Sequence, residues 1–453
     1  MPTTRVLIKP RPVIRRLNAF NFLAGALSLG LGLLAPFTLH IVGDLPIAEI
    51  FVPILLPVLL ITRRRQMARP CIGPLLALLG LWLVGQILTD IYRQTQFLDW
   101  VRGDANIIFF GLDLLVLIGL LGMSETRKCL FIVGQAVGSL LVAKIEPSKL
   151  VADDPWKFGY APATILLVLV VSCYFFRRNN YFVIVLLIAG ISLVNIFMNF
   201  RSVVLFLLVT LAITVPLVPE RVGRLRLMPP PGTTGRVMAM AAMALAAGAL
   251  AAGAIKLATV SGVLGQDAQE KNEKQSQSVG GVLLGGRPEI LVSSRAIFDS
   301  PILGHGSWAK DPKYEEMLAD IQARFGIEYS VESREEQNGG LIPSHSYLLG
   351  SWVSAGVLGS VFWFYLLTKL MKSMVSLSLL RPALMPVYVY LLVHQFWDIL
   401  FSPFASTQRM FAALIIVIMF DLLEQKVPAV ATQRLYGVRA AAHSPRLWKP
   451  SFR

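Results

Sequence analysis

The chain has 453 residues, of which 55% are hydrophobic and only 15% are charged. Soluble domains carry about a quarter of charged residues, so this composition excludes an ordinary soluble protein, and it excludes a disordered or collagen-like chain as well. The formal net charge is +15. In a membrane protein, the positions of the basic residues indicate which loops are cytoplasmic. The three cysteines all fall inside or beside apolar runs, which leaves no disulfide framework and no Cys-type zinc site. They are Cys71, Cys129 and Cys173.

Twelve apolar runs have about the length that a membrane helix needs, which is roughly 20 residues. The basic segment 1–17 precedes the first run without a cleavage pattern, so we expect a retained anchor. The predicted fold is an all-α polytopic membrane protein of about twelve transmembrane helices with both termini on one side. The runs lie near residues 18–39, 46–62, 71–90, 105–122, 129–143, 161–176, 181–199, 202–218, 237–257, 347–367, 383–402 and 408–424.

Basic residues gather in alternate connections between these runs, and the positive-inside rule places such connections in the cytoplasm. Both termini, including the basic tail 425–453, are then cytoplasmic. The basic residues of these connections are Arg63, Arg64, Arg65 and Arg69, then Arg127 and Lys128, Arg177 and Arg178, Arg221, Arg224, Arg226 and Arg236, and finally Lys369, Lys372 and Arg381.

One large polar loop, residues 258–346, separates helices 1–9 (residues 18–257) from helices 10–12 (residues 347–424), and the same rule makes it periplasmic. It holds more acidic than basic residues, so the net charge favours anionic lipid as a contact and does not imply nucleic acid. Residues 265–281 have the composition of a flexible tether. Residues 285–308 show helical spacing followed by a turn, and residues 311–326 predict a charged helix.

Several common catalytic motifs are absent from the sequence. It contains no G-x-x-x-x-G-K-[ST] phosphate loop, no H-E-x-x-H zinc helix, no G-x-S-x-G nucleophile elbow and no Asp-x-Asp pair. The sequence therefore lacks the motifs that usually indicate an ATP-driven pump, a zinc protease or a metal-dependent nucleotide-sugar transferase.

Basic and titratable residues gather instead on the predicted periplasmic face. Arg201 lies in the short connection between the seventh and eighth runs, where an arginine either snorkels to the interface or faces an anion in the bundle. Arg287 and Arg295 lie on the predicted loop helix, and arginine binds phosphate through paired, charge-assisted hydrogen bonds. His345 lies where the loop re-enters the membrane; it is either a helix-start cap or a general base, because imidazole takes up a proton near neutral pH. His305 lies between two glycines of the loop.

These positions resemble the bacterial O-antigen ligase and O-antigen polymerase family. The family pattern has an arginine at the outer start of a helix, a Gly-Arg and a Pro-x-x-Gly-x-Gly turn in a periplasmic loop, and a histidine before a helix with a Gly-x-x-Gly element. The chain departs from this pattern at Ser346, where the family usually has Asn, and at Phe200, where it usually has Ser. The matching residues are Arg201, Gly286, Arg287, Pro301, Gly304, Gly306, His345, Tyr347, Leu348, Gly356 and Gly359.

The resemblance implies an integral-membrane glycosyltransferase of the bacterial inner membrane. Its donor would be an undecaprenyl-diphosphate-linked glycan and its acceptor another glycan, either the lipid A core or a growing polysaccharide, without metal, nucleotide or other cofactor. His345 would be the catalytic base of an inverting displacement, and Arg201, Arg287 and Arg295 would bind the donor diphosphate. The residues that would shape the loop are Gly304, His305 and Gly306.

Other functions remain open at this point. Twelve helices with cytoplasmic termini also suit a secondary transporter, and His394 and Asp398, four residues apart in the eleventh run, are either a proton relay or a polar packing pair. The sequence shows no internal repeat of the kind that transporters have. A ligase, a polymerase and a protein-glycosylating ligase share the same pattern, so the sequence does not distinguish among them.

Overall fold

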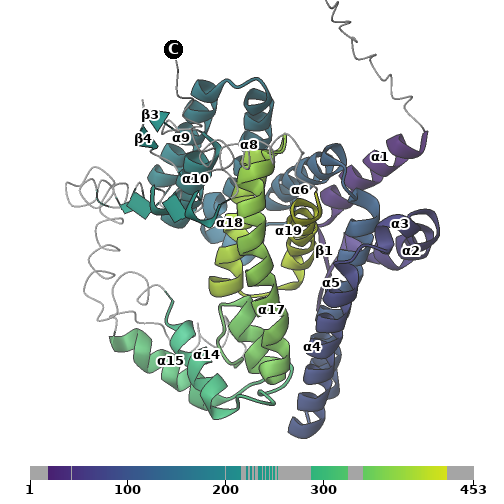
Figure 1. Cartoon of the computed structure of the whole chain (residues 1–453). Coiled ribbons are helices and arrows are strands. Elements are labelled where there is room, and N and C mark those ends of the chain that lie inside the picture. Colours follow the sequence, from purple (N-terminus) through teal and green to yellow (C-terminus); the bar gives the residue numbers. More distant parts are fainter. Residues whose placement is uncertain are drawn as a thin grey trace, which may run out of the picture.

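The computed structural model describes residues 19–41, 43–198, 200–215, 287–324 and 340–425, with short pieces between 221 and 253. In these ranges the chain is a bundle of apolar helices (Figure 1). Six segments are long and apolar enough to cross a bilayer, so the chain is an all-helical multi-pass membrane protein. They are α4 (Ile72–Arg93), α5 (Phe97–Leu121), α6 (Glu125–Ile145), the π-helix η1 (Pro155–Tyr160) joined to α8 (Ala161–Arg177), α17 (Tyr347–Leu380) and α19 (Ser406–Glu424).

Five further apolar helices are shorter, and each lies in one of the predicted runs. The predicted run 237–257 is described only in short pieces. Residues 258–286 of the predicted loop, including Gly286, lie outside the described residues. The total of twelve crossings therefore stays a prediction. The shorter helices are α1 (Ala19–Leu34), α2 (Ile47–Thr62), α9 (Tyr181–Phe197), α10 (Arg201–Thr214) and α18 (Met385–Phe401).

The polar loop forms both predicted helices, but Arg287, which we expected on the first of them, precedes its first residue. α14 (Glu289–Asp299) precedes the turn at Pro301, and α15 (Pro312–Arg324) follows it. Small elements complete the described chain, among them two antiparallel hairpins that an all-helical prediction did not include. They are α3 (Arg64–Met67), α7 (Lys149–Asp153), the hairpin of β1 (Thr38–His40) with β2 (Asp44–Pro46), and that of β3 (Arg221–Val222) with β4 (Leu225–Arg226).

α1 and α6 pack closely because glycines line their contact. A Cβ at Gly32 would lie 2.2 Å from the Phe131 carbonyl oxygen, and a Cβ at Gly138 would lie 2.2 Å from the Leu33 carbonyl oxygen. Gly134 and Gly138 stand four residues apart on α6, which is the small-residue spacing that lets membrane helices approach to backbone contact.

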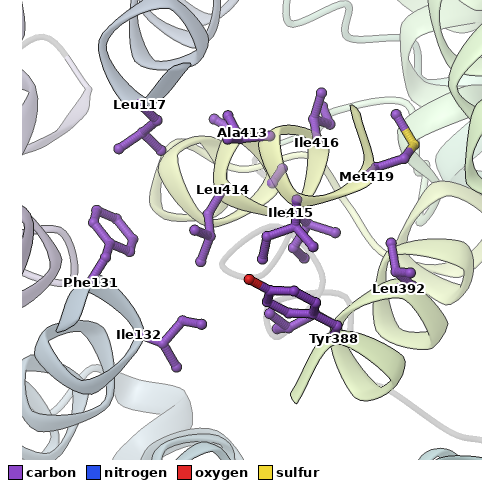
Figure 2. Close-up of a cluster of buried hydrophobic side chains, with 14 of the residues drawn as sticks. Leu117, Phe131, Ile132, Tyr388, Leu392, Ala413, Leu414, Ile415, Ile416 and Met419 are labelled. Carbon is purple, nitrogen blue, oxygen red and sulfur yellow. The ribbon is translucent and has the colours of Figure 1, made fainter. Parts of the chain in front are cut away.

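α19 forms the centre of the bundle. It is the most enclosed of the long helices, with 72% of its most apolar window buried. Figure 2 shows its side chains surrounded by residues of other helices: Leu117 comes from α5, Phe131 from α6, and Tyr388 and Leu392 from α18. A helix that is apolar on all sides packs in this way because every face has a protein neighbour.

Buried ion pairs fix both ends of α19. Near its start, Arg409 donates to both carboxylate oxygens of Glu49 on α2, at 2.8 and 2.6 Å. Near its end, Asp421 pairs with Arg69 at 2.6 Å and also with Lys128 of α6. A charge is tolerated at such depth when it has a partner of opposite sign, so these pairs determine which helix ends lie together.

Contacts between helix ends mark two ends of the bundle. At one end, Arg93 of α4 contacts Gly304 of the loop, and Ser346 at the start of α17 contacts Ile399 of α18. At the opposite end, Arg381, which follows α17, donates to the Tyr181 hydroxyl at 3.2 Å. Figure 1 shows α14 and α15 beside the start of α17, at the first of these ends, which we call the loop end.

Candidate functional site

The turn at Pro301 docks into a break in α17. Gly356 has φ +65° and interrupts the helical backbone, and a Cβ there would lie only 1.9 Å from the Ile302 carbonyl oxygen. The loop backbone fills this break, because His305 N–H donates to the Val353 carbonyl at 2.7 Å. Two separate parts of the sequence pattern, the turn and the first glycine of the Gly-x-x-Gly element, thus make one joint that only a residue without a Cβ permits.

The two turn glycines each allow a close approach. Gly304 has φ +74°, and a Cβ there would lie 2.6 Å from the Gly356 nitrogen. Gly306 has φ +94°, and a Cβ there would lie 2.7 Å from the Thr95 hydroxyl oxygen. At both positions a side chain would meet neighbouring atoms and would need an unfavourable backbone conformation.

α4 holds the other side of the turn. The Asp90 carboxylate accepts hydrogen bonds from the Ser307 N–H at 2.7 Å and from the Ser307 hydroxyl at 2.6 Å. Arg93 donates to the Gly304 carbonyl at 2.8 Å. A carboxylate with several short donors is a strong anchor in a buried setting, so the loop is fixed to α4 as well as to α17.

His305 contacts protein groups on both loop helices. One ring nitrogen, Nε2, lies 2.8 Å from the Ala296 carbonyl of α14, and the ring meets that of Tyr314 of α15 edge to face at 5.4 Å. The Tyr314 hydroxyl in turn donates to Asp299 at 2.8 Å. His305 therefore joins α14, α15 and the turn; its loop-shaping role stays a prediction.

Arg287 lies just before α14 and reaches the end of α18. Its guanidinium donates to the Phe401 carbonyl and lies over the Trp397 ring at 5.7 Å. Burial lowers the pKa of Arg287, and the carboxylates of Glu289 and Asp398 oppose this shift. A half-buried guanidinium beside apolar rings is suited to an anion, because its remaining donors are only partly hydrated.

His345 faces Glu289 at the same place. Its Nδ1 lies 4.0 Å from the nearer Glu289 carboxylate oxygen, and within the described residues neither this Nδ1 nor Glu289 Oε2 has a hydrogen-bond partner, although both atoms are buried. The His345 side chain is nevertheless 39% exposed, so the exposed part of the ring lies away from Nδ1. Burial lowers the pKa of His345; the Glu289 charge acts to raise it and the Arg287 charge acts to lower it.

Arg287, Glu289 and His345 therefore form one group, which we call the loop triad. Sequence reasoning predicted Arg287 and His345 but missed Glu289, although its position two residues after Arg287 was visible. A single acidic residue gives no pattern by itself. The triad lies at the loop end, where α14, α17 and α18 meet.

The other predicted diphosphate ligands are placed differently. Arg295 is half exposed and pairs with Asp299 on its own helix at 3.1 Å; among the described contacts none joins it to the triad. Arg201 is the first residue of α10, the position that the family pattern implies, but its side chain lies outside the described part of the structure. Its role as a diphosphate ligand stays a prediction.

Ser346, the departure from the family pattern beside the histidine, has a clear local role. Its hydroxyl accepts from the Leu349 N–H at 3.1 Å and donates to the Ile399 carbonyl at 2.8 Å. It thus caps α17 and ties the helix start to α18. Tyr347 and Leu348, which also belong to the pattern, are buried core residues.

The intramembrane pair is also formed. His394 Nδ1 lies 2.7 Å from the Asp398 carboxylate, and the ring meets Phe206 of α10 edge to face. His394 lines a cavity of about 290 Å³ between α6, α8 and α18. Because the Asp398 charge acts on Arg287, the two groups that sequence reasoning treated as rivals lie near one another.

Comparison of the chain with models of known protein families, with curated proteins and with solved structures finds no match. Within the described residues no group of three or more His, Cys, Asp and Glu side chains is arranged to hold a metal ion. A functional interpretation therefore rests on the sequence pattern and on the geometry of the loop triad.

Proposed function

We propose that the chain is a membrane glycosyltransferase of the O-antigen ligase or polymerase kind. It would transfer an undecaprenyl-diphosphate-linked oligosaccharide to an acceptor glycan at the periplasmic face of the bacterial inner membrane. The observation that carries this proposal is the meeting of Arg287, Glu289 and His345 at the loop end of the bundle. A cation beside a titratable base is what an anionic leaving group and a hydroxyl nucleophile require.

The proposed reaction is a single inverting displacement. The acceptor hydroxyl oxygen forms a bond to the anomeric carbon of the donor, and the bond from that carbon to the diphosphate oxygen breaks. The diphosphate leaves with the electron pair, and Arg287 stabilises the charge that develops on it. The hydroxyl proton passes to His345 on the exposed part of its ring. Placing donor and acceptor together in this geometry supplies a large share of the rate.

Glu289 would orient the base in this mechanism. A carboxylate near Nδ1 favours the tautomer that carries its proton on Nδ1, which leaves the other ring nitrogen able to accept a proton. The same carboxylate stabilises the imidazolium after the transfer. Its negative charge also offsets that of Arg287, so the triad can hold a charged base beside a cation.

The pH dependence of transfer follows from these charges. His345 acts as a base only when neutral, and burial lowers its pKa below the usual 6.5, so the rate should fall only as the pH drops below 6.5. Glu289→Gln removes a charge that raises this pKa, and we expect the acid limb to move to still lower pH. The measurement is kcat/KM against pH with a purified lipid-linked donor. An acid limb that Glu289→Gln leaves in place would contradict the pairing of Glu289 with the base.

The sidedness of the proposal has its own test. We expect reporter fusions at Gly235 and Gln425 to be cytoplasmic and a fusion at Gln275 to be periplasmic, because basic connections stay in the cytoplasm. Paired alkaline phosphatase and fluorescent protein fusions at each position provide the measurement. A cytoplasmic Gln275 would remove the proposal, since donor and acceptor glycans would then lie on the wrong side.

A second candidate is a secondary transporter. The observation in its favour is the His394–Asp398 pair, a titratable pair in a predicted membrane helix whose histidine lines a cavity. Proton-coupled transport would need this pair and would not need His345. The two functions therefore predict opposite results for the same two substitutions.

A further inference from the structure

Two hollows adjoin at the loop end, on the side that faces α4 and α5. The inner hollow has a volume of about 270 Å³ and the outer one about 350 Å³. Small-ligand sites measure roughly 300–1,000 Å³, so the two together have the size of a site for several sugar rings. They share four lining residues, which makes them neighbours along one groove: Ser307, Trp308, Ala309 and Ile342.

The inner hollow combines aromatic rings with hydroxyl and amide groups. Trp82 and Phe404 line it, with ring centroids 5.9 Å apart, and Asn106, Ser344 and Ser351 supply polar atoms. Carbohydrates present both an apolar face of C–H groups and a rim of hydroxyls. A cavity with apolar rings and a few placed polar groups suits both.

Trp308 forms the boundary between the two hollows. The residue is 48% exposed. Its φ is +52°, a backbone conformation that is costly for a bulky residue. The neighbouring contacts hold it there: Ser307 is bonded to Asp90, and Ile342 N–H donates to the Ala309 carbonyl at 2.9 Å. An exposed indole kept in a strained backbone by its neighbours points to a ligand-facing role.

The outer hollow is polar. Its lining includes Gln96, Asp99 and Lys310, together with Asp311. Such side chains provide both donors and acceptors, and they suit the hydroxyl groups of a sugar chain that extends into water. Ser344 and Ser346, the two chain neighbours of His345, line the inner hollow, whereas the three triad residues do not.

We propose that these two hollows form one groove that binds the acceptor oligosaccharide, with Trp308 stacking on a sugar ring at its centre. This inference rests on the proposed glycosyltransferase function, because it assigns the groove to the acceptor of that reaction. The donor diphosphate belongs on the other side of the α17 start, where Arg287 contacts α18. In this proposal the acceptor approaches from the side of α4 and the donor from the side of α18.

The test uses the full chain in detergent and the oligosaccharides released by mild acid from the host cell-surface polysaccharide. Saturation-transfer NMR measures their binding. Trp308→Gly removes the ring and keeps the turn, because glycine adopts a positive φ without strain. Trp308→Phe retains an aromatic face. Phe298→Ala is the matched control, since Phe298 is 81% exposed on α14 and lines neither hollow.

We expect Trp308→Gly to weaken oligosaccharide binding about tenfold or more, Trp308→Phe to recover part of it, and Phe298→Ala to bind like the wild type. In transfer assays Trp308→Gly should raise the acceptor KM and leave the donor KM and kcat unchanged. The acceptor-groove proposal is contradicted if Trp308→Gly binds the oligosaccharides as tightly as the wild-type protein, or if it raises only the donor KM.

The binding arm separates this inference from the proposed function. If the wild-type protein binds the oligosaccharides through Trp308 but transfers none of them, the oligosaccharide-binding groove is supported and the proposed glycosyltransferase function is contradicted. A wild-type protein that binds none of them overturns the groove, whatever the transfer assay shows.

Discussion

His345→Ala should lower the rate of glycan transfer by about 10² to 10⁴-fold, which is the usual contribution of a positioned general base. The protein should still insert and fold, because the His345 ring is part exposed and its Nδ1 makes no hydrogen bond within the described residues. The measurement is transfer from purified lipid-linked donor at matched protein levels. Size-exclusion profiles in detergent report whether the variant remains folded.

His394→Ala is the matched control for this substitution. It removes a second histidine that also faces a carboxylate, in this case Asp398 at 2.7 Å, but that lies within α18. We expect most transfer activity to remain. The reverse result, an essential His394 and a dispensable His345, would indicate proton-coupled transport and would exclude the proposed enzyme.

Within the described residues, hydropathy located the apolar helices but not their ends. The predicted run 105–122 corresponds to α5, which begins at Phe97, and the predicted run 347–367 corresponds to α17, which continues to Leu380. Asp99 in the first case and Lys369 in the second interrupt the apolar pattern without interrupting the helix. Apolar composition reports how much of a helix suits lipid, whereas backbone hydrogen bonds continue into the water-exposed turns.

Part of the candidate site could be predicted from the order of the helices and loops along the chain. Arg287 and His345 both belong to the predicted loop 258–346, so the sequence placed them at the same end of the bundle. The break at Gly356 could not be predicted, because a glycine in an apolar run is equally typical of close helix packing, as at Gly138. Sequence analysis also missed Trp308, because no sequence pattern predicts a tryptophan with a positive φ.

Buried charges were the largest omission. Arg409 was counted as part of an apolar run, yet it forms a bidentate pair with Glu49 on a helix far away in sequence. A pairing between residues so distant in the chain depends on how the helices pack. Sequence spacing contains no information on it, whereas the local pair of His394 and Asp398 was visible as an i, i+4 spacing.

Arg287→Lys should lower transfer by about 10 to 100-fold even though the positive charge is retained. The guanidinium donates to the Phe401 carbonyl and lies over the Trp397 ring, and it would still have donors for a diphosphate. A lysine ammonium that reached the carbonyl would have no planar face for the ring and no parallel pair of donors for two phosphate oxygens. A lost hydrogen bond between charged groups costs about 1.5–3 kcal/mol, which sets this range.

Arg295→Lys and Arg201→Lys complete the comparison. Arg295 lies on the same loop helix, half exposed and paired with Asp299 at 3.1 Å; exchange of one cation for another in such a surface pair should be nearly silent. Arg201→Lys should resemble Arg287→Lys if both arginines bind the diphosphate. A snorkelling Arg201 would tolerate lysine, because both side chains have a long apolar stem and a cationic end. Wild-type transfer by Arg201→Lys would remove its role as a ligand, and wild-type transfer by Arg287→Lys as well would leave the leaving group without a specific partner.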